Sequence, residues 1–363
     1  MKERISAVDI FRGMTIVLMI LVNNPGTWGA VYPLFLHADW HGYTPTDLVF
    51  PFFLFIVGTS IAFSYQHKSA TVNTYKKITS RSLKLIGLGF FLGAFTITFP
   101  FFKDFSDLRF PGVLQRIGIV FFITSILFIN FNWKVLLGIC ICILVGYWLA
   151  MGFIPVEGVA STFDRAPNNL ANYIDVNVLG NHTWKKDYDP EGILSTIPAV
   201  VSCILGIFTG LILSAKQEKK ATILMGLGGS LLILGHLWDV LFPINKALWS
   251  SSFVLVTAGW ANLILALIYY ITDIKKIKFG SLFSYAGANA ITVFFLSSFI
   301  AKLFGLIQVD AEGNSLHSWL FNTVYIHDVL SMKMSSLLYA ISVMSFYLWV
   351  AYFLYKKQIF IKV

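Results

Sequence analysis

The stretch FLHADWHGYTPTDLVFPFFLFIVGTS, residues 35–60, changes character at its middle. Its first half holds two histidines, two aspartates and a tryptophan, whereas its second half is almost entirely hydrocarbon. Apart from Asp47, the residues from 47 to 65 carry no charge. A helix needs roughly 20 apolar residues to cross a bilayer. Residues 47–65 therefore predict a transmembrane helix with a polar segment at its start.

The composition extends this prediction to the whole chain. Of its 363 residues, 57% are hydrophobic and 12% are charged, whereas a soluble domain carries about 25% charged residues. We therefore expect a polytopic protein of the lipid bilayer. A net charge of +9 does not indicate a nucleic-acid partner here, because Lys and Arg lie in short loops between apolar spans. Cys140, Cys142 and Cys203 lie in apolar segments without metal or redox spacing, so no metal is expected.

Further apolar segments have the length of a membrane span. Backbone groups in lipid must be satisfied within the helix, so these segments predict an all-α bundle of about ten transmembrane helices, in a single domain over residues 1–363. The first segment lacks a small-residue cleavage site and is interpreted as a retained helix. The predicted spans are 7–23, 47–65, 82–100, 114–131, 134–154, 192–214, 222–242, 252–272, 281–305 and 335–355.

The basic residues predict the orientation of the bundle. Segments on one side hold 17 of the 27 Lys and Arg residues, which places the N-terminus and the C-terminus in the cytoplasm. Four loops then lie outside, at 24–46, 101–113, 155–191 and 306–334, and 155–191 has the composition of a folded loop. Neither an internal repeat nor a pair of helices broken at Gly or Pro is evident, which argues against an inverted-repeat transporter.

His37 and Asp47 are candidates for catalysis at the outer end of the second span. A carboxylate that holds one imidazole nitrogen fixes the tautomer and makes the other nitrogen more basic. Such a pair could deprotonate an amine or hydroxyl, or His37 could itself attack an acyl donor. The alternative is that His37 is an interfacial histidine and Asp47 caps the helix.

Ionisable residues at membrane depth are the next candidates. Asp9 and Arg12 lie three residues apart in the first span, and Arg116 lies just inside the fourth. Buried charge is costly in a membrane, so these groups are functional candidates, and the planar guanidinium suits phosphate. Asp9 and Arg12 could instead form a structural pair at the inner rim. His182 and His236 are interpreted as core histidines.

Six blocks together resemble the heparan-α-glucosaminide N-acetyltransferase family of transmembrane acyltransferases. They occur in the order of the family: SAVDIFRGMTIVLMILVNN (6–24), HADWHGYTPTDLVFPFFLFIVGTS (37–60), RFPGVLQRIG (109–118), YDPEGILSTIPAV (188–200), FPINKALWSSSFV (242–254) and YKKQIFIKV (355–363). The resemblance implies transfer of an acetyl group from cytoplasmic acetyl-CoA to an amino sugar of the glucosamine type across the membrane. It also implies a compact, bacterial-type member in the cytoplasmic membrane, and members of the family suggest a homodimer.

The resemblance also implies roles for single residues. His37 falls on the catalytic histidine of an HxxWxG block, and Asp47 falls on the aspartate of a DLVFP block. Asn23 or Asn24 matches an asparagine that closes the first helix, and it would polarise the thioester carbonyl. His41 stands where the animal enzyme has asparagine, and it is a rival base.

Further residues of the blocks are assigned to the two substrates. For four of them a structural role is the alternative to binding a substrate. Asp189 and Glu191 could cap a helix, and Lys246 could be a snorkelling lysine beside Trp249, an interfacial tryptophan. The expected acetyl-CoA contacts are Arg12, Arg116, Gln115 and Lys246. The expected contacts of the amino sugar are Trp40, Asp189, Glu191, Asn245 and Trp249.

Two other functions remain open at this point. An O-acyltransferase of an envelope polysaccharide would use the same donor and histidine with a hydroxyl acceptor. A secondary transporter would relay protons through His37 and Asp47 and bind an anionic solute at Arg116.

Overall fold

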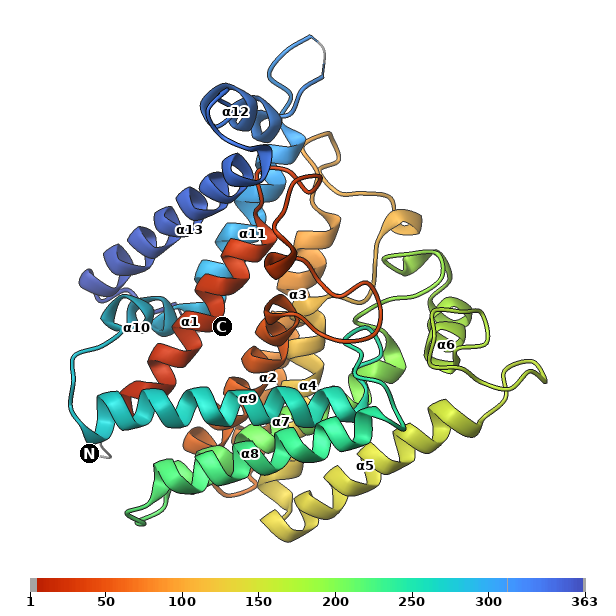
Figure 1. Cartoon of the computed structure of the whole chain (residues 1–363), viewed down its shortest axis with the longest axis vertical. Helices are drawn as coiled ribbons and strands as arrows, with labels where there is room; N and C mark the ends of the chain where they lie inside the picture. Colours follow the sequence, from red (N-terminus) through yellow and green to blue (C-terminus); the bar gives the residue numbers. More distant parts are fainter. Residues whose placement is uncertain (1–4, 312, 362–363) are drawn as a thin grey trace.

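The computed structural model describes residues 5–311 and 313–361, and these residues form a helical bundle without a regular β-strand (Figure 1). The all-α prediction is confirmed. The helices are α1 Ser6–Asn23, α2 Pro45–Tyr65, α3 Val72–Ala94, α4 Val113–Asn130, α5 Trp133–Phe153, α6 Leu170–Leu179, α7 Ile193–Ser214, α8 Lys220–Asp239, α9 Ser251–Tyr269, α10 Ser281–Ala288, α11 Ala290–Leu306, α12 Leu316–Val324 and α13 Met332–Lys356. A π-helical turn, Tyr270–Ile274, extends α9, and 3-10 turns lie at Pro33–Phe35, Phe105–Asp107 and Gly180–His182.

The membrane-spanning helices number eight or nine in the described residues, fewer than the ten expected. Eight are long and apolar enough to cross a bilayer, and a bent pair of helices makes nine if it counts as one span. The predicted span 82–100 is the one lost. α3 has 23 residues but ends at Ala94, and it carries Lys76, Lys77, Arg81 and Lys84.

The predicted span 281–305 is broken rather than continuous. α10 and α11 meet at Asn289 with a bend of 81°. The break allows close contact with α1, since a Cβ on Gly287 would lie 2.1 Å from the carbonyl oxygen of Asp9. The sequence predicted a continuous span here, and a broken helix is a feature that secondary transporters also have.

α2 and α7 form the centre of the bundle. In each of these two helices, 67% of the most apolar 18-residue segment is buried inside the protein. Glycines let the two helices approach closely, because a Cβ on Gly58 would lie 1.8 Å from the carbonyl oxygen of Cys203, and one on Gly206 would lie 1.9 Å from that of Phe55. Small residues at helix contacts are typical of membrane bundles, where close packing replaces the hydrophobic effect.

Other helices lie at the periphery of the bundle. Only 22% of the corresponding 18-residue segment is buried in α13, and only 28% is buried in each of α5 and α8. Figure 1 shows α8 lying alongside α9 on the lower side of the bundle, with α6 beside the bundle in the segment predicted as a folded loop. Their apolar outer faces suit contact with lipid.

Two cavities lie along α1 and α2, at opposite ends of these helices. Asn23, at the end of α1, lines one cavity, and Arg12, near its start, lines the other. On α2, Phe50 lines the first and Phe53 lines the second. The rings of α2 therefore stand between the two cavities.

Candidate functional site

The start of α2 places Asp47 opposite His37. Thr44 is the N-cap residue, Pro45 begins the helix, and Asp47 completes a capping box. The Asp47 Oδ2 atom accepts the backbone N–H groups of Thr44 at 2.9 Å and Ala38 at 3.0 Å. Asp47 therefore does cap the helix, and its other oxygen remains available for a second partner.

That second partner is the imidazole of His37. Its Nδ1 lies 2.7 Å from Asp47 Oδ1. The side chain of Asp47 is 1% exposed, whereas that of His37 is 50% exposed. A carboxylate only accepts, so in the neutral ring Nδ1 carries the proton and Nε2 keeps its lone pair. This arrangement matches the imidazole–carboxylate geometry of a general base.

Lys246 completes this group from the segment between α8 and α9. Its Nζ lies 2.9 Å and 3.2 Å from the two imidazole nitrogens of His37, and 3.4 Å from Asp47 Oδ1. Burial lowers the pKa of Lys246, although the charge of Asp47 opposes that effect. A cation, a carboxylate and an imidazole thus lie together, with the two charges balanced.

These three side chains line a cavity of about 610 Å³. Asn23, Trp40 and Glu191 also line it, so six of the predicted site residues converge on one space. Trp40 is held by its Nε1, which donates to the carbonyl oxygen of Phe163 at 2.9 Å. The exposed Trp28 and Trp184 and the partly buried Tyr188 add aromatic surface to the same cavity.

Other predicted residues lie outside this cavity lining. Asn24 donates to the carbonyl oxygen of Ile20, at the end of α1. Asn245 is fully buried, and its side chain accepts the backbone N–H of Leu248. Trp249 is buried and donates to Ser202 at 3.0 Å. Gln115 is buried next to Gly89 and Gly112. Arg12 lies in the second cavity.

Arg116 is buried behind the site rather than exposed to the cavity. It donates to Ser195 Oγ and to the carbonyl oxygen of Gly192 at 3.2 Å, and its guanidinium lies over the ring of Trp249. Its Nε and Nη1 have no hydrogen-bond partner among the described residues. In this arrangement Arg116 fixes the start of α7 and does not reach a ligand in the 610 Å³ cavity.

Arg109 was missed by the sequence analysis, although it opens the RFPGVLQRIG block. It donates to both carboxylate oxygens of Asp189, at 2.8 and 2.5 Å, and to Glu191 at 2.5 Å. Burial acts to lower the pKa of Arg109, but the hydrogen bonds and charges of these two carboxylates raise it above its usual value. Asp189 is thereby committed to an ion pair, whereas Arg109 and Glu191 face the cavity.

The other histidines have partners away from His37. His41 Nε2 lies 2.9 Å from Asp164 Oδ1, and neither residue lines the cavity. His182 stacks on Phe110 and contacts the carbonyl oxygen of Leu108. His236 lies on α8 near the ring of Tyr43. The rival base His41 is thus separated from the aspartate that orients His37.

Asp175 provides a test by pH. Burial raises the pKa of this α6 carboxyl from 3.8 to about 7, although it accepts the backbone N–H of Ile193. Between these two values the folded state holds a proton that the unfolded chain has released. The contribution of Asp175 to the free energy of unfolding is therefore favourable at low pH and is lost as the pH rises from about 4 to about 7. We expect Asp175→Asn to raise the thermal midpoint at about pH 8 more than at about pH 5. Thermal unfolding in detergent at both pH values measures this, and an equal shift at both would contradict it.

Comparison with known proteins shows the family of the chain. The family model described as heparan-alpha-glucosaminide N-acetyltransferase, catalytic, matches residues 4–236. The chain belongs to the heparan-alpha-glucosaminide N-acetyltransferase family. The mouse (Mus musculus) heparan-alpha-glucosaminide N-acetyltransferase is 30% identical over 426 residues, 99% of this chain and 61% of the relative. The human (Homo sapiens) protein of that name is 30% identical over 427 residues, 100% of this chain and 60% of the relative.

The match to the heparan-alpha-glucosaminide N-acetyltransferase family includes the residues of the site only in part. Residues 4–236 contain Asn23, His37, Asp47 and Glu191, but Lys246 lies beyond them. The chain spans about three fifths of the length of these curated relatives.

Proposed function

We propose that this chain is a transmembrane acetyltransferase that moves an acetyl group from acetyl-CoA to the amine of an amino sugar. The observation that carries the proposal is the contact of His37 with Asp47 and Lys246 inside one cavity. The family membership supports the same chemistry.

His37 acts as the base in this proposal. An amine must be neutral to attack a thioester. In this proposal the incoming amine displaces the ammonium of Lys246 from Nε2 of His37, and Nε2 then accepts the amine proton while Asp47 holds Nδ1. The C–N bond then forms, the C–S bond breaks, and coenzyme A leaves as a thiol once it gains a proton. In a second form of the mechanism, His37 first receives the acetyl group and the amine then attacks the acetyl-imidazole.

Lys246 and Asn23 supply hydrogen-bond donors on the same cavity wall. The thioester carbonyl gains negative charge as the amine attacks, and donors fixed near it lower the barrier. The ammonium of Lys246 is already beside the imidazole, and the side chain of Asn23 faces the same cavity from the end of α1. We assign both residues to this stabilisation.

Aromatic and acidic residues suit the acceptor. Trp40, Trp184 and Tyr188 offer ring faces and edges that pack on the apolar face of a pyranose. The carboxylate of Glu191 attracts an ammonium before deprotonation. We therefore propose that the amino sugar binds between these rings and His37.

The arrangement of basic residues supports a sidedness for the reaction. With both termini in the cytoplasm, the cavity of His37 opens on the extracytoplasmic side of a bacterial cytoplasmic membrane. The acyl donor then reaches this cavity from the opposite side, because a charged nucleotide does not cross lipid freely.

An assay of the purified full chain tests the function. We expect release of free coenzyme A only when acetyl-CoA and glucosamine are both present, with N-acetylglucosamine as product. A sugar that carries hydroxyls but no amine, such as glucose, is the matched control. Equal release of coenzyme A with glucose would show that the acceptor group is a hydroxyl and not an amine. No release with either sugar, together with solute uptake by proteoliposomes, would support the transporter instead.

A further inference from the structure

Lys246 is the residue with a primary amine among the described residues that line the cavity of His37. Its Nζ lies 3.2 Å from Nε2 of His37, the nitrogen that takes a proton from the acceptor in the proposed mechanism. A group whose proton is taken by a general base must lie within this range of it. The amine of Lys246 therefore already occupies the position that the amine of an acceptor has to reach.

The turn between α8 and α9 fixes Lys246 in this position. The backbone carbonyl oxygen of Lys246 accepts the N–H of Trp249 at 3.1 Å, which closes the turn. The preceding carbonyl, of Ile244, accepts the backbone N–H of Gly42 at 2.7 Å. Gly42 belongs to the loop that carries His37, so this hydrogen bond joins the two segments directly. The amine and the imidazole are thus held together by the backbone as well as by their own contact.

A lysine attacks a thioester only after it has lost a proton, and the surroundings of Lys246 allow that loss. Nε2 of His37 is in contact with Nζ and can take the proton. Burial acts to lower the pKa of Lys246, whereas the carboxylate of Asp47, 3.4 Å from Nζ, opposes this effect. The side chain of Lys246 remains 20% exposed, so a donor in the cavity can reach it.

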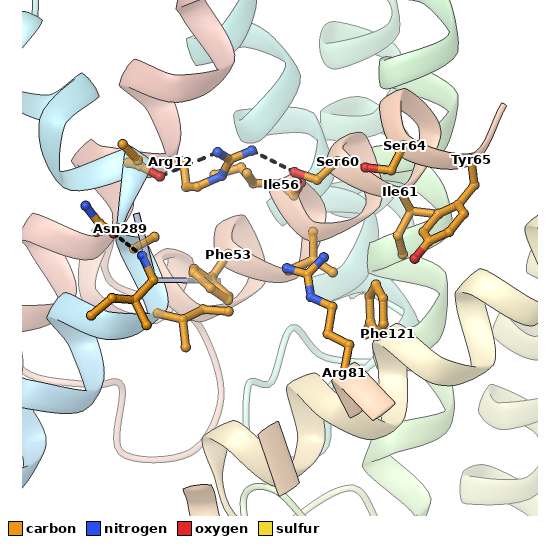
Figure 2. Close-up of a pocket in the computed structure, with 16 residues that line it drawn as sticks. Arg12, Phe53, Ile56, Ser60, Ile61, Ser64, Tyr65, Arg81, Phe121 and Asn289 are labelled. Atoms are coloured by element: carbon orange, nitrogen blue, oxygen red, sulfur yellow. Dashed lines mark hydrogen bonds between the residues drawn. The ribbon is translucent and has the colours of Figure 1, made fainter. Parts of the chain in front are cut away.

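The cavity that Arg12 lines has basic groups of another kind. Figure 2 shows the guanidinium groups of Arg12 and Arg81 at its walls, and no lysine lines it among the described residues. A guanidinium stays protonated and offers no free electron pair to a thioester. Of the two cavities, only that of His37 therefore holds an amine that can take an acetyl group.

We propose that Lys246 is a site of self-acetylation and takes the acetyl group of acetyl-CoA when no acceptor occupies the cavity. This inference rests on the proposed function, because the donor and the base are the same. Nζ first passes a proton to Nε2 of His37, and the neutral amine then attacks the thioester carbonyl. The C–N bond forms and the C–S bond breaks. A second proton of Nζ goes to the sulfur of coenzyme A, and the proton held by His37 is released to water.

The modification inactivates the site. The amide nitrogen carries no charge, so Asp47 loses the cation beside it, and the thioester carbonyl of a later donor loses a charged hydrogen-bond donor. The new acetyl group also stays next to His37, where the acceptor amine has to enter. A bound amino sugar displaces Lys246 from Nε2 and so protects it. Each chain releases one coenzyme A in this reaction, far fewer than the repeated turnovers expected with an acceptor.

Mass spectrometry of the purified full chain tests the proposal. The protein is incubated with acetyl-CoA, with and without glucosamine, and the fraction of each lysine that carries an acetyl group is measured after proteolysis. We expect acetylated Lys246 to accumulate with acetyl-CoA alone and to be suppressed by glucosamine. Lys185 is the internal control for uncatalysed acetylation, because it is exposed and its Nζ lies over the ring of Trp184, which lines the same cavity.

Two variants separate catalysed from uncatalysed acetylation. His37→Ala keeps the lysine but removes its base, and we expect acetylation of Lys246 to slow at least about 100-fold while that of Lys185 is unchanged. Lys246→Arg keeps the positive charge without the amine, and we expect the release of coenzyme A in the absence of acceptor to fall to background. Thermal midpoints close to that of the parent show that both variants are folded.

The outcomes distinguish this proposal from the proposed function. Acetylation of Lys246 no higher than that of Lys185, in a chain that acetylates glucosamine, would overturn self-acetylation and leave the proposed function intact. Undiminished acetylation of Lys246 in His37→Ala would also overturn it, because the base would then have no part in the reaction. Acetylated Lys246 without transfer to glucosamine would support self-acetylation and exclude glucosamine as the acceptor. If neither amine is acetylated, both proposals are overturned.

Discussion

His37→Ala is expected to lower the rate of acetyl transfer by about 10³-fold, because the amine then has no base to take its proton. The side chain is half exposed in the cavity, so its removal leaves no buried void. We therefore expect the thermal midpoint of the variant to stay close to that of the parent. Initial rates of coenzyme A release, with both substrates saturating, measure the effect.

His41→Ala is the matched control for this substitution. It removes an imidazole four residues away that pairs with Asp164 and does not line the cavity. We expect its rate to remain within a few-fold of the parent. Near-normal turnover in His37→Ala, with loss of turnover in His41→Ala, would transfer the role of base to His41.

Asp47→Asn is expected to lower kcat by about 10³-fold with little change in KM, because it inverts the tautomer of His37. The backbone N–H groups of Thr44 and Ala38 both donate to Oδ2, so the amide oxygen of Asn takes that position. The amide nitrogen then faces Nδ1 of His37 and donates to it. The ring proton moves to Nε2, and the lone pair that accepts the amine proton is lost.

The same substitution separates capping from catalysis. An asparagine oxygen still accepts the two backbone N–H groups, so α2 keeps its start and the fold is retained. Asp164→Asn is the control, because it makes the equivalent change beside His41. A normal rate in Asp47→Asn would show that Asp47 serves only to cap α2.

The fold was predicted well where the physical signal is local. Uninterrupted apolar length predicts α2 and α7, because lipid requires each helix to satisfy its own backbone. The failures have long-range causes. The break between α10 and α11 lies beside the close approach of Gly287 to the backbone of Asp9, a contact across most of the chain. The shorter α3 shows that apolar residues after Ala94 form a loop instead of extending the span.

The site was predictable to a similar extent. Motif spacing brought together His37 and Asp47, which are ten residues apart and joined by the loop that leads into α2. Arg109 pairs with Asp189 across 80 residues. Arg81 lines a cavity together with residues of the α10–α11 break, which lies more than 200 residues later. No pattern near either arginine contains that information. Contacts of this kind are defined by packing and not by local sequence.

The closeness of the two cavities on α2 also has an electrical consequence. Phe50 lines one cavity and Phe53 lines the other. These two residues are separated by about 4.5 Å along the axis of α2, at 1.5 Å per residue. If the two cavities open to opposite sides of the bilayer and both hold water, the voltage falls mainly over this thin aromatic layer instead of over about 30 Å of hydrocarbon. A charge that passed these rings would then experience most of the membrane potential, about 2.3 kcal/mol per 100 mV, within a single helical turn.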